Sequence, residues 1–148
     1  MLNQELLEQQ LSELPLYIYH FFDPKTLEFT ERVRWICTHE CPMYGTSWAC
    51  PPAVGSVHHC KAKCLGYDHA LVIATITEVA DIANIEETLA TRPDHEAITN
   101  QVRDHFRAQG IEPYVESHGI NILPLIEELG LCFQYGENVV TWFSLLLY

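Results

Sequence analysis

The chain has 148 residues, of which 48% are hydrophobic and 19% are charged, a composition typical of a single globular domain spanning residues 1–148. Twenty acidic residues against eight basic ones give a net charge of −12, which argues against a general nucleic-acid binder and against charge-driven binding to anionic lipid. No apolar run approaches the ~18 residues of a membrane span, and residues 1–5 lack the start of a secretory signal, so we expect a cytoplasmic protein without membrane contact.

The N-terminal part of the chain is expected to begin with a helix and a hairpin. Leucines recur at helical spacing over residues 2–14, and Pro15 ends the pattern. Residues 16–22 are rich in β-forming side chains and lead into a turn signal at residues 23–25. They are therefore predicted to pair with residues 27–29 as a hairpin.

Residues 33–55 are predicted to form a long loop, because they show no sustained periodicity and contain three prolines and two glycines. A loop of about twenty residues is uncommon in a compact domain unless something besides backbone hydrogen bonds holds it, and a metal would do so. Ser56 is expected to cap a helix that runs to about Tyr67. A continuous apolar run over residues 70–76 then predicts a buried strand.

The second half of the chain predicts further helices followed by strands. Apolar positions at helical spacing indicate one helix around residues 82–89 and another around residues 98–106, which Gly110 ends. The remaining predicted elements are a short helix and two strands, over residues 122–129, 131–133 and 139–147. We expect an α+β fold with a small mixed or antiparallel sheet, several helices and a long metal-bound cysteine loop within residues 33–64.

Five of the six cysteines fall within 28 residues: Cys37, Cys41, Cys50, Cys60 and Cys64. An odd number in a chain without a visible export signal does not suit a disulfide framework, whereas clustered cysteines in a reducing compartment more often hold a metal. Half of the basic residues flank this cluster, so residues 31–64 carry a charge of +2 and the remainder carries −14. Nearby positive charge favours the thiolate, which is the form that ligates metal.

The spacing of these cysteines favours an iron–sulfur cluster and leaves zinc open. The segment has no CxxC pair of the kind that structural zinc sites usually offer. Cys41-Pro42 and Cys50-Pro51 are Cys-Pro steps, like the one at the last ligand of bacterial ferredoxin runs. Redox-active or merely buried thiols are a third interpretation.

Four thiolates satisfy either a [4Fe-4S] cluster or Zn²⁺, so one of the five clustered cysteines is spare. Cys64 is expected to be the spare one, because it lies beside Leu65 where the helix leads into the buried strand, and it would pack as a small apolar side chain. Cys132 stands between two apolar residues and is expected in the core. No histidine is assigned as a ligand, and no nucleotide-binding or nucleophile-elbow motif is present.

The motifs of this segment are Cys41-Pro-x-Tyr44-Gly45, Trp48-x-Cys50-Pro51-Pro52 and Cys60-x3-Cys64-Leu65-x-Tyr67. Their combination resembles a family of predicted metal-binding proteins of anaerobic bacteria and archaea, known mainly as a domain of unknown function. Residues 119–147 look like the C-terminal part of that family. Longer members carry a second cysteine cluster where residues 107–118 have none, so the resemblance implies metal binding at one site and brings no established reaction with it.

Two hypotheses of different classes follow. In the first, Cys37, Cys41, Cys50 and Cys60 ligate one [4Fe-4S] cluster, with Cys64 as an alternative fourth ligand, for electron transfer, redox sensing or assistance to a redox partner protein. In the second, zinc stabilises a binding module without catalysis. A thiol-dependent enzyme is a weaker third hypothesis.

Residues around the cysteines are expected to protect the metal and to balance its charge. Trp48 and Tyr44 would shield the site, and Gly45 would allow a tight backbone turn. The nearby basic side chains would offset an anionic cluster; they are Arg34, Lys61 and Lys63.

Overall fold

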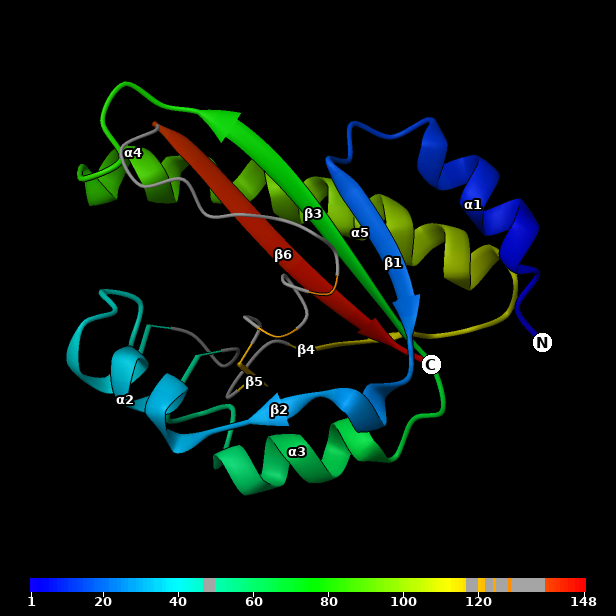
Figure 1. Ribbon diagram of the computed structural model, residues 1–148, viewed down its shortest axis with the longest axis horizontal. Coiled ribbons are helices and arrows are strands. Elements are labelled where there is room, and N and C mark those ends of the chain that lie inside the picture. Colours follow the sequence, from blue (N-terminus) through cyan, green and yellow to red (C-terminus); the bar gives the residue numbers. More distant parts are fainter. Residues whose placement is uncertain (47–49, 117–119, 122–123, 125–127, 129–137) are drawn as a thin grey trace.

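The computed structural model describes residues 1–46, 50–116, 120–121, 124, 128 and 138–148. Its centre is a four-stranded antiparallel sheet with the strand order β1-β3-β6-β4 (Figure 1). The strands are β1 (Ile18–Phe22), β3 (Ala70–Glu78), β4 (Tyr114–Glu116) and β6 (Val139–Leu147). The predicted α+β class is confirmed, and the sheet is antiparallel rather than mixed.

Strands β3 and β6 form the long central pair of this sheet. All nine residues of β3 pair with β6, from Ala70 opposite Leu147 to Glu78 opposite Val139. The first six residues of β3 are buried, as expected for a continuous apolar run that is covered on both faces. Both strand predictions in this part of the chain are confirmed.

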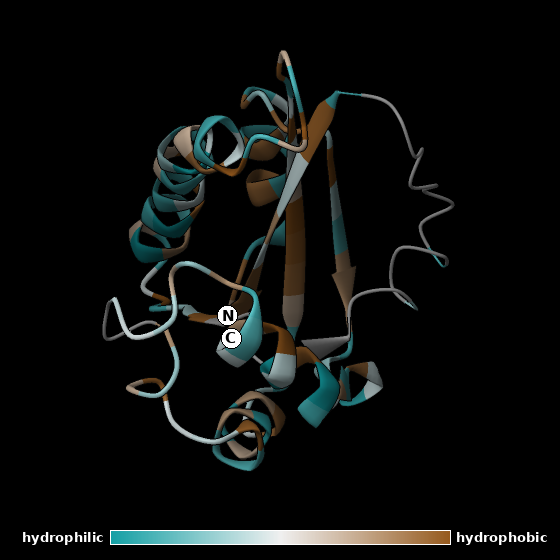
Figure 2. Cartoon of the chain, turned by 90° about the vertical axis from the view of Figure 1, so that its left-hand side faces the viewer, coloured by the Kyte–Doolittle hydropathy of each residue, from teal (hydrophilic) through white to brown (hydrophobic). Residues whose placement is uncertain are grey.

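Helices cover one face of the sheet and supply much of its core. They are α1 (Gln4–Ser12) and α5 (Arg92–Ala108), preceded by the shorter α4 (Ile85–Ala90), and Figure 2 shows the hydrophobic colouring concentrated on the strands that they cover. The fully buried residues of this layer are Leu7, Leu11, Leu71, Ile73, Val102, Phe106 and Leu146. Gly110, with a φ of 79°, follows the end of α5 as predicted. Among the residues described, none of the helices combines the length and the apolar character needed to cross a bilayer.

A second apolar cluster attaches helix α3 (Val57–Leu65) to the sheet. Ala70 and Val72 alternate along β3 with the residues of the first core, so they point to the opposite face. Cys64 of α3 packs against them and against Leu145 and Leu147 of β6. The end of α3 is therefore fixed to the sheet through a cysteine side chain.

The predicted N-terminal hairpin is wrong. The chain leaves β1 through a short 3-10 helix, η1 (Pro24–Thr26), in which the side chain of Asp23 accepts a hydrogen bond from the Lys25 amide. Strand β2 (Glu28–Phe29) then pairs with the distant β5 (Ile120–Asn121), not with β1. Pairing with a strand some ninety residues away leaves no local signal, because only the turn chemistry is visible in the sequence.

The predicted loop over residues 33–55 is also wrong in its first part. Residues Glu31–His39 form helix α2, in which Thr30 Oγ1 accepts the first-turn hydrogen bond from the Arg32 amide. None of the residues of α2 is fully buried, and its aliphatic residues Val33 and Ile36 cover only one helical turn, which is too short a repeat to predict a helix. Of the predicted elements over residues 122–129 and 131–133, the structure describes residues 124 and 128 alone, so these two predictions are not tested.

Candidate metal centre

Cys37 and Cys41 lie at the C-terminal end of α2, which Figure 1 places near α3 and β2. The Cys41 amide donates to the Ile36 carbonyl at 3.1 Å, so the chain makes a tight turn as it leaves the helix. A second turn follows at once, because the Tyr44 amide donates to the Cys41 carbonyl at 3.2 Å. Both thiols are partly exposed.

One backbone hydrogen bond joins the two turns of the cysteine segment. The Gly45 amide donates to the Pro51 carbonyl at 2.8 Å, and Gly45 adopts a φ of 73°, which glycine tolerates without steric cost. Cys50 begins another turn further along the chain, in which the Cys50 carbonyl accepts a hydrogen bond from the Val54 amide at 3.2 Å. The expectation of a tight turn at Gly45 is confirmed, and this turn brings the Cys41 and Cys50 regions together.

The thiols of Cys37, Cys41 and Cys50 interact electrostatically. Burial raises the pKa of the Cys37 thiol, and the neighbouring Cys41 and Cys50 thiols raise it further, while the Arg34 guanidinium opposes them. Each of these three cysteines carries a free thiol. Since Cys50 is far from Cys37 along the chain, the fold itself brings its sulfur into this group.

Helix α3 presents the other two clustered cysteines in different surroundings. Ser56 Oγ accepts from the His59 amide at 3.1 Å, which confirms the predicted cap. Cys60 is 1% exposed, and its Sγ lies 3.9 Å from the Val54 carbonyl, within the turn that Cys50 begins. Cys64 is 0% exposed and belongs to the apolar cluster on the sheet. Cys60 thus faces the cysteine segment, whereas Cys64 faces the core.

The residues present fit an anionic thiolate centre in their chemistry. Nε and Nη2 of Arg34 are buried and have no hydrogen-bond partner among the described residues, so they could donate to an anion beside Cys37. Within that same part of the chain, no three His, Cys, Asp or Glu side chains are arranged so that they could hold a metal ion. The thiols would therefore have to close around a metal, which is usual when binding and local folding are coupled.

The basic side chains expected to offset a cluster are not equivalent. Lys63 Nζ lies 4.8 Å from the centre of the Tyr114 ring, in a cation–π contact. Lys61 is exposed on α3. The Arg34 guanidinium lowers the pKa of the Cys37 thiol. Of the three expected residues, Arg34 is therefore the one that acts on Cys37.

The aromatic and histidine residues of the segment lie mostly at the surface. Tyr44 is 42% exposed, so it does not enclose the site. The His39 ring stacks on Trp35 with 4.3 Å between ring centres, and its Nδ1 lies 2.9 Å from the Trp35 carbonyl, so it is held against its own helix. Two residues of the sequence-based hypothesis, Trp48 and Cys132, lie outside the described residues.

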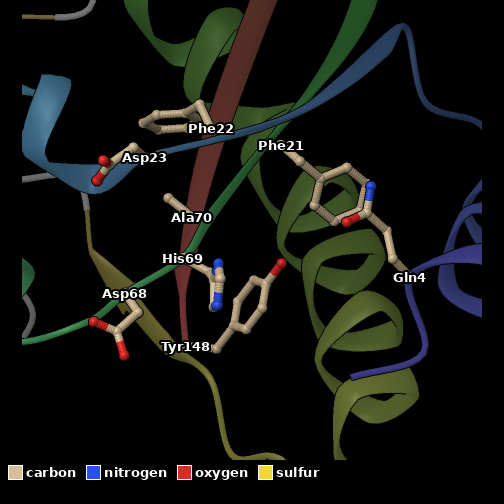
Figure 3. Close-up of a pocket in the computed structure, with 8 residues that line it drawn as sticks. All are labelled: Gln4, Phe21, Phe22, Asp23, Asp68, His69, Ala70 and Tyr148. Carbon is tan, nitrogen blue, oxygen red and sulfur yellow. The ribbon is translucent and has the colours of Figure 1, made fainter. Parts of the chain in front are cut away.

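A separate pocket of about 370 Å³ opens where β1, β3 and β6 meet (Figure 3). His69 and Tyr148 line it, with their rings stacked at a centre-to-centre distance of 5.3 Å. Asp23 and Asp68 contribute carboxylates to its wall. No cysteine lines this pocket, so it is distinct from the cysteine segment.

Sequence reasoning missed a buried polar network between α5 and the sheet. His95 is 4% exposed, with Thr75 Oγ1 2.7 Å from its Nδ1 and Ser144 Oγ 2.7 Å from its Nε2. Thr99 Oγ1 lies 2.9 Å from the same serine oxygen. The one available signal was the spacing of His95 and Thr99, which places them on the face of α5 that also carries Phe106.

Comparison with protein families identifies the chain. The family described as "Predicted metal-binding protein (DUF2284)" matches residues 20–115, more than half of the chain and all five clustered cysteines. The chain belongs to this DUF2284 family. The match confirms the family that the cysteine motifs resemble. The resemblance over residues 119–147 is not tested, because the match ends at residue 115. Curated proteins and solved structures give no match to this DUF2284 protein.

Proposed function

We propose that this DUF2284 protein carries one [4Fe-4S] cluster on Cys37, Cys41, Cys50 and Cys60. The observation that carries the proposal is the electrostatic influence of the Cys41 and Cys50 thiols on Cys37, which relates donors from α2 and from the following turns to one another. Cys60 completes the set because its Sγ faces the turn that Cys50 begins. Cys64 is the alternative fourth ligand, and as a buried core side chain it is the spare one.

The cluster would supply one-electron transfer, and the chain's residues would bind it and expose it to a partner. Cys37 and Cys41 are partly exposed, so electrons would have a short path to the surface on this side. Trp35 and Ile36 are 51% and 46% exposed beside them and offer apolar contact area. We therefore assign a role in electron transfer, redox sensing or assistance to a redox partner protein.

The cysteines also bear on location and domain organisation. An odd number of clustered cysteines does not suit a disulfide framework and is more typical of a metal site in a reducing compartment, which supports a cytoplasmic protein. The sheet, its helices and the cysteine segment share packing through Cys64. We therefore treat residues 1–148 as one metal-binding domain.

A zinc-stabilised binding module is the second candidate, and one observation favours it. Helix α2 buries none of its residues, so the segment around Cys37 has little apolar packing of its own. A structural zinc site contributes folding free energy of roughly 10 kcal/mol or more, enough to hold such a segment. A thiol enzyme fits less well, because the raised pKa of Cys37 leaves less thiolate at neutral pH.

Anaerobic purification followed by an absorption spectrum and analysis of metal and acid-labile sulfide tests the proposal. A brown protein that contains iron and sulfide in equal amounts, about four of each per chain, is the expected result. A colourless protein with one zinc per chain would replace the first candidate with the second. A folded protein that binds neither metal would overturn both.

A further inference from the structure

Arg34 has an unusual environment for a residue on a helix that buries none of its residues. Its Nε and Nη2 atoms are inaccessible to solvent and lack a hydrogen-bond acceptor among the described residues. The ion pairs found in that part of the chain involve Arg92 and Arg107, so no described carboxylate neutralises Arg34. Two guanidinium nitrogens that are shielded from solvent and have no acceptor are costly, so this arrangement is suited to binding an anion.

The position of Arg34 indicates where that anion would lie. Residues three apart on a helix share a face, which places Arg34 beside Cys37. The Arg34 guanidinium and the Cys37 thiol also interact electrostatically, so these two side chains lie close together. The negative charge of a metal-bound thiolate or inorganic sulfide at Cys37 would therefore meet the two unsatisfied N–H groups.

The other cations of the segment lack this combination of burial and proximity. Arg32 is on the same helix but is exposed. Lys63 is directed onto the Tyr114 ring. Arg32 therefore provides a matched comparison, with the same side chain and the same charge on the same helix but without the burial.

We propose that Arg34 is a positioning residue of the metal centre, which donates N–H hydrogen bonds to sulfur at Cys37 and so favours the more reduced state. The inference rests on the proposed iron–sulfur function. Reduction adds one electron and one negative charge to a cluster without breaking a bond, and hydrogen bonds to sulfur stabilise the added charge. Arg34 thereby raises the reduction potential of the centre.

The experiment compares Arg34→Gln, Arg34→Lys and the control Arg32→Gln with the wild-type protein. Each is purified anaerobically, analysed for iron and sulfide, and titrated with dithionite in the presence of redox mediators while the spectrum is followed. We expect Arg34→Gln to keep the wild-type iron and sulfide content and to show a more negative midpoint potential than Arg32→Gln. Arg34→Lys keeps the charge but loses the planar fork, so its potential should fall between wild type and Arg34→Gln.

The outcomes separate this inference from the proposed function. Equal potentials in Arg34→Gln and Arg32→Gln would overturn the role of Arg34 while leaving the cluster in place. If Arg34→Gln loses its metal, the Arg34→Lys variant tests the inference instead. A midpoint potential of Arg34→Lys below that of the wild type supports the inference. A folded Arg34→Lys protein that binds no metal overturns it. If the wild type holds zinc, the iron–sulfur proposal fails and the effect on the reduction potential fails with it. Faster zinc loss to a chelator from Arg34→Gln than from Arg32→Gln would then support only the hydrogen bonding of Arg34 to sulfur. A wild-type protein without metal overturns both.

Discussion

Ser144 Oγ lies 2.7 Å from Nε2 of His95, which joins the last strand of the sheet to the first turns of α5. Thr75 Oγ1 occupies the other ring nitrogen, so a neutral imidazole can donate on one side and accept on the other. Burial lowers the pKa of His95, and Arg92 lowers it further, while Glu96 and the Phe143 carbonyl oppose them. The buried ring is therefore held in its neutral form, between a helix and two strands.

This neutral histidine predicts a loss of stability in acid. The unfolded chain takes up a proton near the ordinary pKa of 6.5, whereas the folded chain does so only at lower pH. The contribution of His95 is thus complete above about pH 6.5 and falls as the pH decreases below it, by at most about 1.4 kcal/mol per pH unit. Urea denaturation at several pH values should show this slope in the wild type and a shallower slope in His95→Gln. An unchanged slope in His95→Gln would contradict the assignment, and His105→Gln on the same helix serves as the control.

The ligand set predicts opposite results for two cysteine variants. Cys50→Ser should abolish the metal centre, because Cys50 is one of the three thiols that interact at Cys37. Cys132→Ser should leave the metal content unchanged, because Cys132 stands between Leu131 and Phe133 and is expected in the core. Iron and sulfide analysis with the visible spectrum measures both. Equal loss of metal in the two variants would show that the ligand set is wrong.

Substitutions of the two cysteines of α3 should also have different effects on metal content and stability. Cys60→Ala should lose the metal, since its Sγ faces the turn that begins at Cys50. Cys64→Ala should keep the metal but lower the free energy of unfolding by about 1 kcal/mol, because it removes a buried sulfur from the cluster with Ala70 and Val72. Metal analysis and urea denaturation of each variant distinguish these effects. If Cys64→Ala loses the metal and Cys60→Ala keeps it, Cys64 is the fourth ligand and Cys60 is the spare cysteine.

Removing the metal should destabilise α2 before the sheet. The helix buries none of its residues, so a metal bound by Cys37 would be its main link to the rest of the protein. Anaerobic treatment with a chelator should therefore make Arg32 and Arg34 rapid sites of tryptic cleavage, while Arg103 of α5 stays protected. Mass spectrometry of the fragments identifies the sites. Cleavage at the same rate with and without metal would show that α2 is held in another way.

The sequence predicts best those elements whose burial is local and continuous. The apolar run of β3, the apolar spacing on α5 and the cap at Ser56 each carry their cause within a few neighbouring residues. Helix α2 escaped prediction because its apolar repeat covers only one turn, and β2 did because its partner β5 lies far along the chain. The His95 network was not predictable, since its partners Thr75 and Ser144 are 20 and 49 residues away.

The candidate site likewise has features that the sequence predicts and features that only the fold shows. Cysteine spacing predicts which segment holds the metal, and the family match agrees with metal binding while leaving the ligand set a prediction. Composition could not distinguish Arg34 from Lys63, because both are simply basic residues near cysteines. Only the fold directs one toward Cys37 and the other toward the Tyr114 ring.

Cys64 is embedded in the core, so it fixes α3 to the sheet and holds Cys60, one helical turn away, in a set position. The other three proposed ligands belong to an unburied helix and two turns joined by the Gly45–Pro51 hydrogen bond. Most of the conformational entropy lost when the thiols close around a metal would therefore be lost by α2 and these two turns. Evolution can then adjust how tightly a metal is held by substitutions in α2 and these turns, without altering the sheet on which folding depends.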